Sequence, residues 1–222
     1  MGLTMSEQDY LKFQKLHEYN LGAKKYLIDD PNFNSLWESI IYKYPDKAHF
    51  VYELIQNADD AKATWISFIL CRDGLIFKHN GTVHFTVTDP EDHSVMGHIN
   101  SITVIGRSTK RFDNISNTIG KFGVGFKAVF SYTTRPEIYD DNFQFAIEDY
   151  IIPIQLEHDH PERKAGETLF YFPFKDADTA YSDILFKLQS LKNPNLFLNN
   201  IEDIEWQAET DEKGHERIES AL

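Results

Sequence analysis

A carboxylate, an amide and a second carboxylate occur at helical spacing in the segment DKAHFVYELIQNADDA, residues 46–61. On a helix, which turns about 100° per residue, Glu53, Asn57 and Asp60 form a single stripe. An amide oxygen is a suitable ligand for Mg²⁺, and a carboxylate one turn away can polarise a water for attack on a γ-phosphate. By pattern alone such a stripe is more often the solvated flank of an ordinary helix, so both interpretations stay open.

The other residues of this helix indicate where the stripe lies. One side carries Tyr52, Gln56 and Asp59, which we expect to face solvent. The stripe borders an apolar arc, so it is expected at the margin of the core. The arc consists of Phe50, Val51, Leu54, Ile55, Ala58 and Ala61.

A glycine-rich segment, IGKFGVGFKAVF at residues 119–130, precedes an apolar helical pattern. Glycines let backbone N–H groups approach an anion closely, and the following helix N-terminus adds its dipole. The G-x-x-G-x-G order matches neither the P-loop nor the dinucleotide fingerprint, and no strand precedes it. The alternative interpretation is a flexible turn.

Basic residues gather around this segment in a chain of net charge −13. They indicate an electrostatic site for a polyphosphate, although a solvated basic loop would give the same pattern. Against one acid, Asp113, the segment holds Arg107, Lys110, Arg111, Lys121 and Lys127.

The elements that would position these groups predict an α/β (α+β) two-layer sandwich, with a mixed, mostly antiparallel sheet and helices on one face. We expect an N-terminal helical extension over 1–34, a main domain over 35–205 that carries these candidate residues, and a polar tail over 206–222 cut from a larger protein. Helices are predicted at 6–28, 35–44, 46–61, 126–132 and 179–192, a hairpin at 64–78, and further strands at 137–140, 143–148, 150–156 and 168–174.

Composition excludes several classes of protein. The 222 residues suit one large domain, and the net charge of −13 argues against broad binding to nucleic acid or anionic membranes. The single cysteine, Cys71, excludes an internal disulfide and a cysteine zinc site. We therefore expect a cytoplasmic protein, and no apolar run is long enough to span a membrane.

Two motifs together resemble a known family. ELIQNADDA at 53–61 resembles the N-box of the gyrase, heat-shock chaperone, histidine kinase and MutL (GHKL) superfamily. VIGRSTK at 104–110 and IGKFGVGFKAVF at 119–130 are similar to its lid-edge segment and second glycine box. The likeness is closest to the sacsin-like, chaperone-like branch, whose members often carry LIQNADDA, HNG-type, IGRSTK and GKFG-GFK segments. It covers roughly residues 35–175.

The resemblance implies a Bergerat-type fold that binds ATP and Mg²⁺. Glu53 would be the general base, Asn57 the Mg²⁺ ligand, and Asp60 a support near the nucleotide. Lys110 or Lys121 would neutralise phosphate charge. Residues 107–118 would form a short lid, and Thr168 would help to hold the adenine. Backbone contacts to the phosphates would come from Gly120, Lys121, Phe122, Gly123, Val124, Gly125 and Phe126.

One position departs from the superfamily pattern. An Asp-x-Gly motif usually supplies a carboxylate that accepts the adenine amino group, but this chain reads Lys78-His79-Asn80-Gly81. A neutral imidazole could accept that hydrogen bond, but less strongly. Either His79 or Asn80 reads the base, a water intervenes, or the nucleotide preference differs.

Three hypotheses for function follow, in order of preference. The first is a slow ATPase module of a larger chaperone-like or defence-type protein. It would need other domains, a protein partner or a dimer to complete its site. The second is a module that binds nucleotide without turnover, and the third is a scaffold without nucleotide. A zinc site is disfavoured because the spacing matches no metal motif at His79, His84, His93 and His98.

Overall fold

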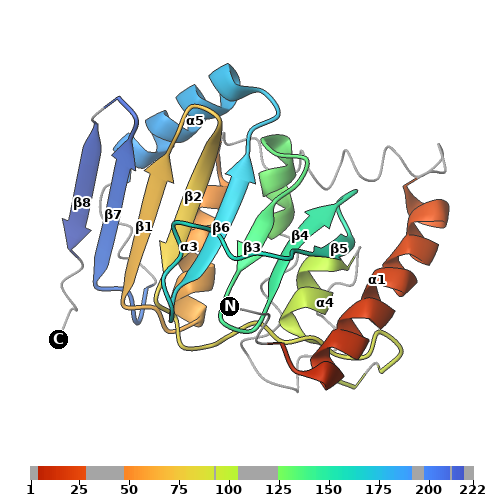
Figure 1. Cartoon of the computed structure of the whole chain (residues 1–222). Helices are drawn as coiled ribbons and strands as arrows, with labels where there is room; N and C mark the ends of the chain where they lie inside the picture. Colours follow the sequence, from red (N-terminus) through yellow and green to blue (C-terminus); the bar gives the residue numbers. More distant parts are fainter. Residues whose placement is uncertain are drawn as a thin grey trace.

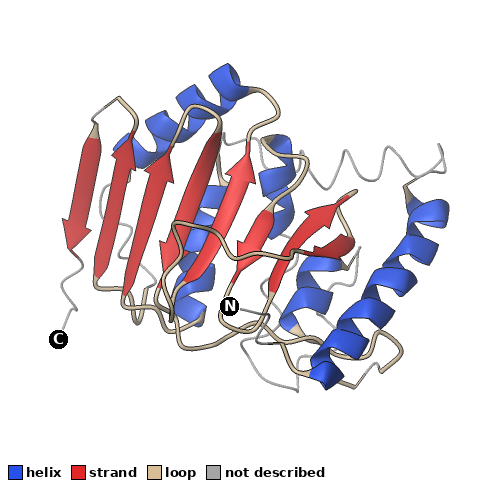
Figure 2. Cartoon of the chain, viewed as in Figure 1, coloured by secondary structure: helices blue, strands red, loops and turns tan. Residues whose placement is uncertain are grey.

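The computed structural model describes residues 5–28, 48–92, 94–104, 125–191, 198–210 and 212–217. Within these residues the chain forms an α+β fold, in which helices pack on an open eight-stranded sheet (Figures 1 and 2). The helices are α1 (Glu7–Leu27), α3 (Phe50–Asp60), α4 (His98–Thr103), the 3₁₀ helix η2 (Phe126–Ser131) and α5 (Ala177–Gln189). The strands are β1 (Trp65–Leu70), β2 (Gly74–His79), β3 (Glu137–Tyr139), β4 (Gln144–Glu148), β5 (Ile152–Gln155), β6 (Thr168–Pro173), β7 (Asp203–Ala208) and β8 (Lys213–Arg217).

The sheet is mixed and mostly antiparallel, as the sequence predicts. Its strand order is β5-β4-β3-β6-β2-β1-β7-β8, and β1 with β7 is the parallel pair. The predicted hairpin is confirmed, because β1 pairs with β2 across a turn that Cys71 closes by donating to the carbonyl of Gly74. This topology places β2 and β6 side by side in the centre of the sheet.

The helix layer lies behind the sheet in the view of Figure 1, where the strands partly hide α3 and α5 and α4 lies near β5. Burial along β1 alternates, so Ile66, Phe68 and Leu70 are enclosed while the residues between them are half-buried. The apolar arc predicted on α3 is also buried. These side chains join a single core, which fixes the helix and its polar stripe against the sheet.

The opposite face of the sheet is crossed by the loop 156–167 between β5 and β6, which runs in front of the strands in Figure 1. A smaller apolar cluster lies on this face, formed by Ile76, Tyr139 and Leu169. The ring of His160 packs edge-on against Tyr139, with the ring centroids 5.4 Å apart. The loop therefore covers part of the sheet surface that the helices leave open.

Helix α1 is attached to the edge of the sheet at β5. The amide of Asn20 donates to the carbonyl of Ile151 at 2.7 Å, and Lys24 forms an ion pair with Asp149. Phe13, on the same helix, is buried in the main core. The segment predicted as an extension thus packs directly on the domain.

The prediction that Asp59 faces solvent is wrong. Its side chain is buried, and its carboxylate accepts backbone N–H groups from Asn199, Asn200 and Ile201 at 2.7–3.1 Å. The helical pattern of residues 46–61 contains no information about this distant loop, which folds onto the end of α3. The buried carboxylate connects α3 to the loop before β7.

The C-terminal region also differs from the expected polar tail. Lys213–Arg217 form β8, which pairs antiparallel with β7 at the edge of the sheet. The burial pattern of β8 alternates between exposed and half-buried residues, as expected for an edge strand with little core contact. The residues of β8, KGHER, are mostly polar, which explains why the sequence of this strand resembles that of a solvated tail.

Candidate functional site

A cavity of about 350 Å³ opens where β2 ends and β6 begins, beside the C-terminal end of α3. It brings together three of the predicted nucleotide-site residues, Asp60, His79 and Thr168, which are far apart in the sequence. The complete lining is Asp60, Ala61, Lys62, His79, Val83, His84, Phe85, His98, Thr168 and Phe170.

His79 and Thr168 lie directly opposite each other on neighbouring strands. They are Cα partners in the antiparallel pair β2–β6, and both are nearly enclosed, with 4% and 2% of their surfaces exposed. Such a pair presents its side chains on one face of the sheet, about 5 Å apart at Cβ. Aromatic rings flank the pair, since His79 lies 6.1 Å from Phe170 between ring centroids.

The imidazole of His79 is neutral in this setting. Burial, with a smaller contribution from nearby His84, lowers the pKa of His79 to about 3. Its Nδ1 accepts a hydrogen bond from the backbone N–H of Gly81 at 3.0 Å. Gly81 itself has no room for a side chain, because a Cβ would approach the carbonyl oxygen of Ala61 to 2.8 Å. The turn after β2 is thus closed against the end of α3.

Asn80, the other residue considered for reading the base, has a different role in the structure. Its side-chain oxygen accepts the backbone N–H groups of Thr64 and Trp65, and its nitrogen donates to the Thr64 hydroxyl. It is not part of the cavity lining. The side chain of Asn80 therefore holds the start of β1, and His79 is the residue of this motif that borders the cavity.

The stripe on α3 continues from the cavity. Asp60 lines the cavity, and Asn57 lies one turn earlier on the same side of the helix. Asn57 is 5% exposed, and its side-chain amide makes no hydrogen bond in the described part of the chain. Because no fully enclosed side-chain nitrogen or oxygen in that part lacks a partner, this amide must reach open space. Within the described part of the chain, its oxygen is available to a ligand.

Glu53 lies one further turn along α3, next to the end of the glycine segment. One carboxylate oxygen is 3.8 Å from Nε2 of His49, and the other faces Gly125. Gly125 and Phe126 are the described residues of the predicted phosphate loop, and Phe126 is buried against Phe170. The other members of that loop, residues 120–124, and Lys110 lie outside the described residues.

Lys127, which the sequence groups with the basic residues of an expected polyphosphate site, belongs neither to a solvated loop nor to an open cationic surface. It is buried, and its Nζ donates to the carbonyls of Ile102 and Tyr150, each at 2.6 Å. Burial lowers the pKa of its ammonium group to about 7. The residue joins η2 to α4 and to the β4–β5 turn, so it positions the chain after the glycine segment.

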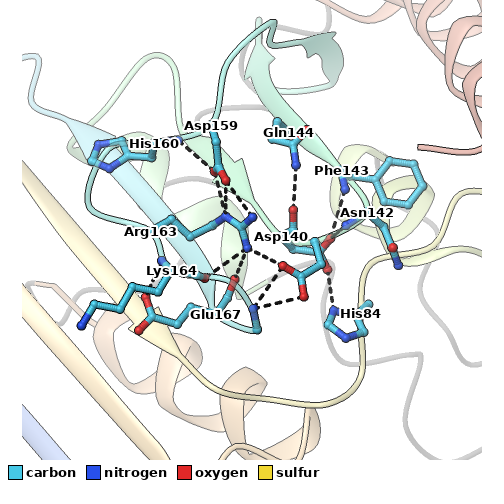
Figure 3. Close-up of polar contacts among 12 residues, drawn as sticks. His84, Asp140, Asn142, Phe143, Gln144, Asp159, His160, Arg163, Lys164 and Glu167 are labelled. Carbon is cyan, nitrogen blue, oxygen red and sulfur yellow. Dashed lines mark hydrogen bonds and ion pairs between the residues drawn. The ribbon is translucent and has the colours of Figure 1, made fainter. Parts of the chain in front are cut away.

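His84 and Phe85 form one wall of the cavity, which was not predicted from the sequence. Asp140 holds this wall in place (Figure 3). The fully buried carboxylate of Asp140 accepts the backbone N–H of Phe85 at 2.9 Å and lies 3.3 Å from Nδ1 of His84. The alternation of apolar and polar residues in FTVT, residues 85–88, is the sequence signal that could have revealed this segment, in which Phe85 and Val87 are buried.

The start of β6 is held by a second polar cluster, also shown in Figure 3. Arg163 pairs with Asp159 and with Asp141, and it donates to the carbonyl of Glu167 at 2.9 Å. These contacts fix the end of the loop 156–167 at Glu167, the residue that directly precedes Thr168. The position of Thr168 in the cavity wall therefore depends on this loop.

The fold and site together define an α+β domain with a cavity at the ends of its two central strands and, on the adjacent helix, a buried amide that has no partner among the described residues. The family model described as Sacsin domain matches residues 31–169 of the 222, and the chain belongs to this family.

Two larger proteins contain a region similar to this chain. Protein NO VEIN of Arabidopsis thaliana is 33% identical over 121 residues, and Sacsin of Homo sapiens is 30% identical over 123 residues. The alignments cover 50% and 51% of this chain but only 4% and 3% of those proteins. The chain thus corresponds to one small part of each relative. Among the described residues, no helix has the length and apolar character needed to cross a membrane.

Proposed function

We propose that this domain binds a Mg²⁺–purine nucleoside triphosphate of the ATP type and hydrolyses it slowly. The base would lie in the cavity beside His79 and Thr168, and the phosphates would extend towards the glycine segment. The domain would act as a nucleotide-gated module of a larger chaperone-like or defence-type protein, together with other domains, a protein partner or a second copy.

The observation that carries this proposal is the state of Asn57. Its side-chain amide is 5% exposed, has no hydrogen-bond partner in the described residues and borders open space, so a bound ligand can use its oxygen. It lies on the same stripe of α3 as Asp60, which lines the cavity. A helix stripe that served only as a solvated flank would not bury such an amide.

The site chemistry fits Mg²⁺ bound together with phosphate. Mg²⁺ keeps several waters and usually takes only one or two protein oxygens, with the remaining ligands from the nucleotide. Asn57 would supply one such oxygen, and the ion would neutralise phosphate charge. The described residues contain no group of three or more His, Cys, Asp or Glu side chains suited to a metal. A metal held mainly by nucleotide and water agrees with that composition.

The remaining roles follow from the resemblance to the GHKL superfamily, of which we propose this is a Bergerat-type member. Glu53 would orient the attacking water. The backbone of residues 120–125 would bind phosphate oxygens, with Lys110 or Lys121 balancing their charge. The membership in the Sacsin domain family and the mixed sheet with one helix layer support this assignment.

A second candidate function is nucleotide sensing without turnover. It is favoured by the imidazole of His79, which stands where the superfamily usually has a carboxylate. In this case the domain would bind the nucleotide and change its contacts with neighbouring domains, and release would occur without hydrolysis.

Calorimetric titration of the chain with ATP, ADP and a non-hydrolysable ATP analogue, with Mg²⁺ and with EDTA, tests the proposal. We expect Mg²⁺-dependent binding of the triphosphates. Asn57→Ala should remove the difference between the Mg²⁺ and EDTA titrations, whereas the exposed neighbour change Gln56→Ala should preserve it. Absence of binding by every nucleotide would reject the proposal, and binding without phosphate release would favour the sensor.

A further inference from the structure

The hydrogen-bonding polarity of the cavity is set by His79. A neutral imidazole has one N–H donor and one acceptor nitrogen. Because Nδ1 accepts the backbone N–H of Gly81 at 3.0 Å, Nδ1 is the acceptor. The ring proton therefore resides on Nε2, and the buried ring stays neutral because its pKa is lowered to about 3.

The Nε2 atom points to the cavity. It has no hydrogen-bond partner in the described part of the chain, although His79 as a whole is only 4% exposed. No fully enclosed side-chain nitrogen or oxygen in that part is unpartnered, so Nε2 must border open space, and His79 lines the cavity. The cavity wall thus presents an N–H donor where a carboxylate would present an acceptor.

The hydroxyl group of Thr168 completes this edge. Thr168 lies directly across from His79, is 2% exposed and lines the same cavity. Its hydroxyl also has no hydrogen-bond partner among the described residues. A hydroxyl can donate or accept, so Thr168 adapts to the ligand while Nε2–H can only donate.

We infer that His79 selects a ligand with a hydrogen-bond acceptor, so that the site takes 6-oxopurine nucleotides in preference to adenine nucleotides. The inference rests on the proposed nucleotide-binding function. An oxo group at position 6 accepts a hydrogen bond from Nε2–H. The 6-amino group of adenine is itself a donor, so it would place two donors opposite each other. A buried donor left unpaired in this way is unfavourable. One net hydrogen bond corresponds to roughly 2- to 10-fold in affinity.

Inosine triphosphate and ATP form the matched pair of probes, because they differ only at position 6 and in the protonation of N1. We expect ITP, titrated with Mg²⁺ into the unchanged chain, to bind more tightly than ATP. The variant His79→Asp should reverse the order, since its carboxylate accepts. Circular dichroism and thermal unfolding establish that the variant is folded, and the comparison on the unchanged chain does not depend on it.

The outcomes separate the selection of 6-oxopurines by His79 from the nucleotide-binding function itself. If ATP binds more tightly than ITP to the unchanged chain, the selection by His79 is wrong and the nucleotide-binding function stands. If neither triphosphate binds, the proposed function fails and the inference fails with it. Tighter binding of ITP, reversed in His79→Asp, supports both.

Discussion

Gly125 lies against the carboxylate of Glu53 so closely that a methyl group on Gly125 would come within 2.0 Å of Glu53 Oε2. The backbone of Gly125 has φ −67°, which any residue can adopt, so the glycine matters here for space and not for conformation. The end of the glycine segment thus packs directly against Glu53, the first polar residue of the α3 stripe.

Gly125→Ala should displace the Glu53 side chain and destabilise the domain by about 1–3 kcal/mol, as expected for overpacking. The combined change with Glu53→Ala should recover most of that loss, because it removes the atoms that clash. Urea unfolding of both single variants and the double variant measures the coupling. Strictly additive free energies would show that the two residues do not restrict each other.

Glu53→Gln should keep nucleotide binding and reduce hydrolysis, because the amide retains the shape of the side chain but is not a base. Loss of a general base typically lowers the rate about 10²- to 10⁴-fold. Phosphate release and calorimetric affinity, measured on the same preparations, separate catalysis from binding. Equal turnover by Glu53→Gln and the unchanged chain would reject Glu53 as the base.

Asp59→Ala should destabilise the domain by about 3 kcal/mol, because three backbone N–H groups would lose a charged acceptor. The adjacent loop 198–201 should become more accessible to hydrogen exchange. Gln56→Ala, on the exposed side of α3, is the control and should change stability by less than about 0.5 kcal/mol. Similar effects of the two changes would indicate that the buried carboxylate contributes little.

The parts of the site that could be predicted from the sequence are those set by local pattern. The helical period of residues 50–60 and the turn before Gly74 are short-range signals, and both α3 and the β1–β2 hairpin follow them. The pairing of His79 with Thr168 depends on strand register across the sheet, which no local pattern specifies. Which nitrogen of His79 carries the proton depends on the hydrogen bond from Gly81 in the turn after β2, so only the structure could identify it.

Lys127 should make the domain more stable as the pH rises above 7. Its pKa is about 7 in the folded chain and near 10.5 when exposed, so the unfolded chain holds more protons on this residue between these values. Stability therefore increases with pH there, by up to about 1.4 kcal/mol per unit. Its neutral amine still has two N–H donors for the carbonyls of Ile102 and Tyr150.

Urea unfolding at pH 7 and pH 8.5 measures this dependence, with Lys127→Met as the comparison. The upper pH is kept below 9 because burial raises the pKa of the Cys71 thiol, which acts in the opposite direction at higher pH. The Met variant should show little of the rise. The same rise in both proteins would assign it to other groups.

His79 should make the domain less stable as the pH falls below about 6.5. Its folded pKa is about 3 because burial disfavours the charged ring, so the unfolded chain binds the extra proton between these values. In His79→Asn, whose side-chain oxygen can replace Nδ1 as acceptor for Gly81, the loss between pH 6.5 and 5 should be smaller by up to about 1.4 kcal/mol per unit. Lowered pKa values of His98 and His160 contribute equally to both proteins. Identical pH profiles would mean that burial does not lower the pKa of His79 in solution.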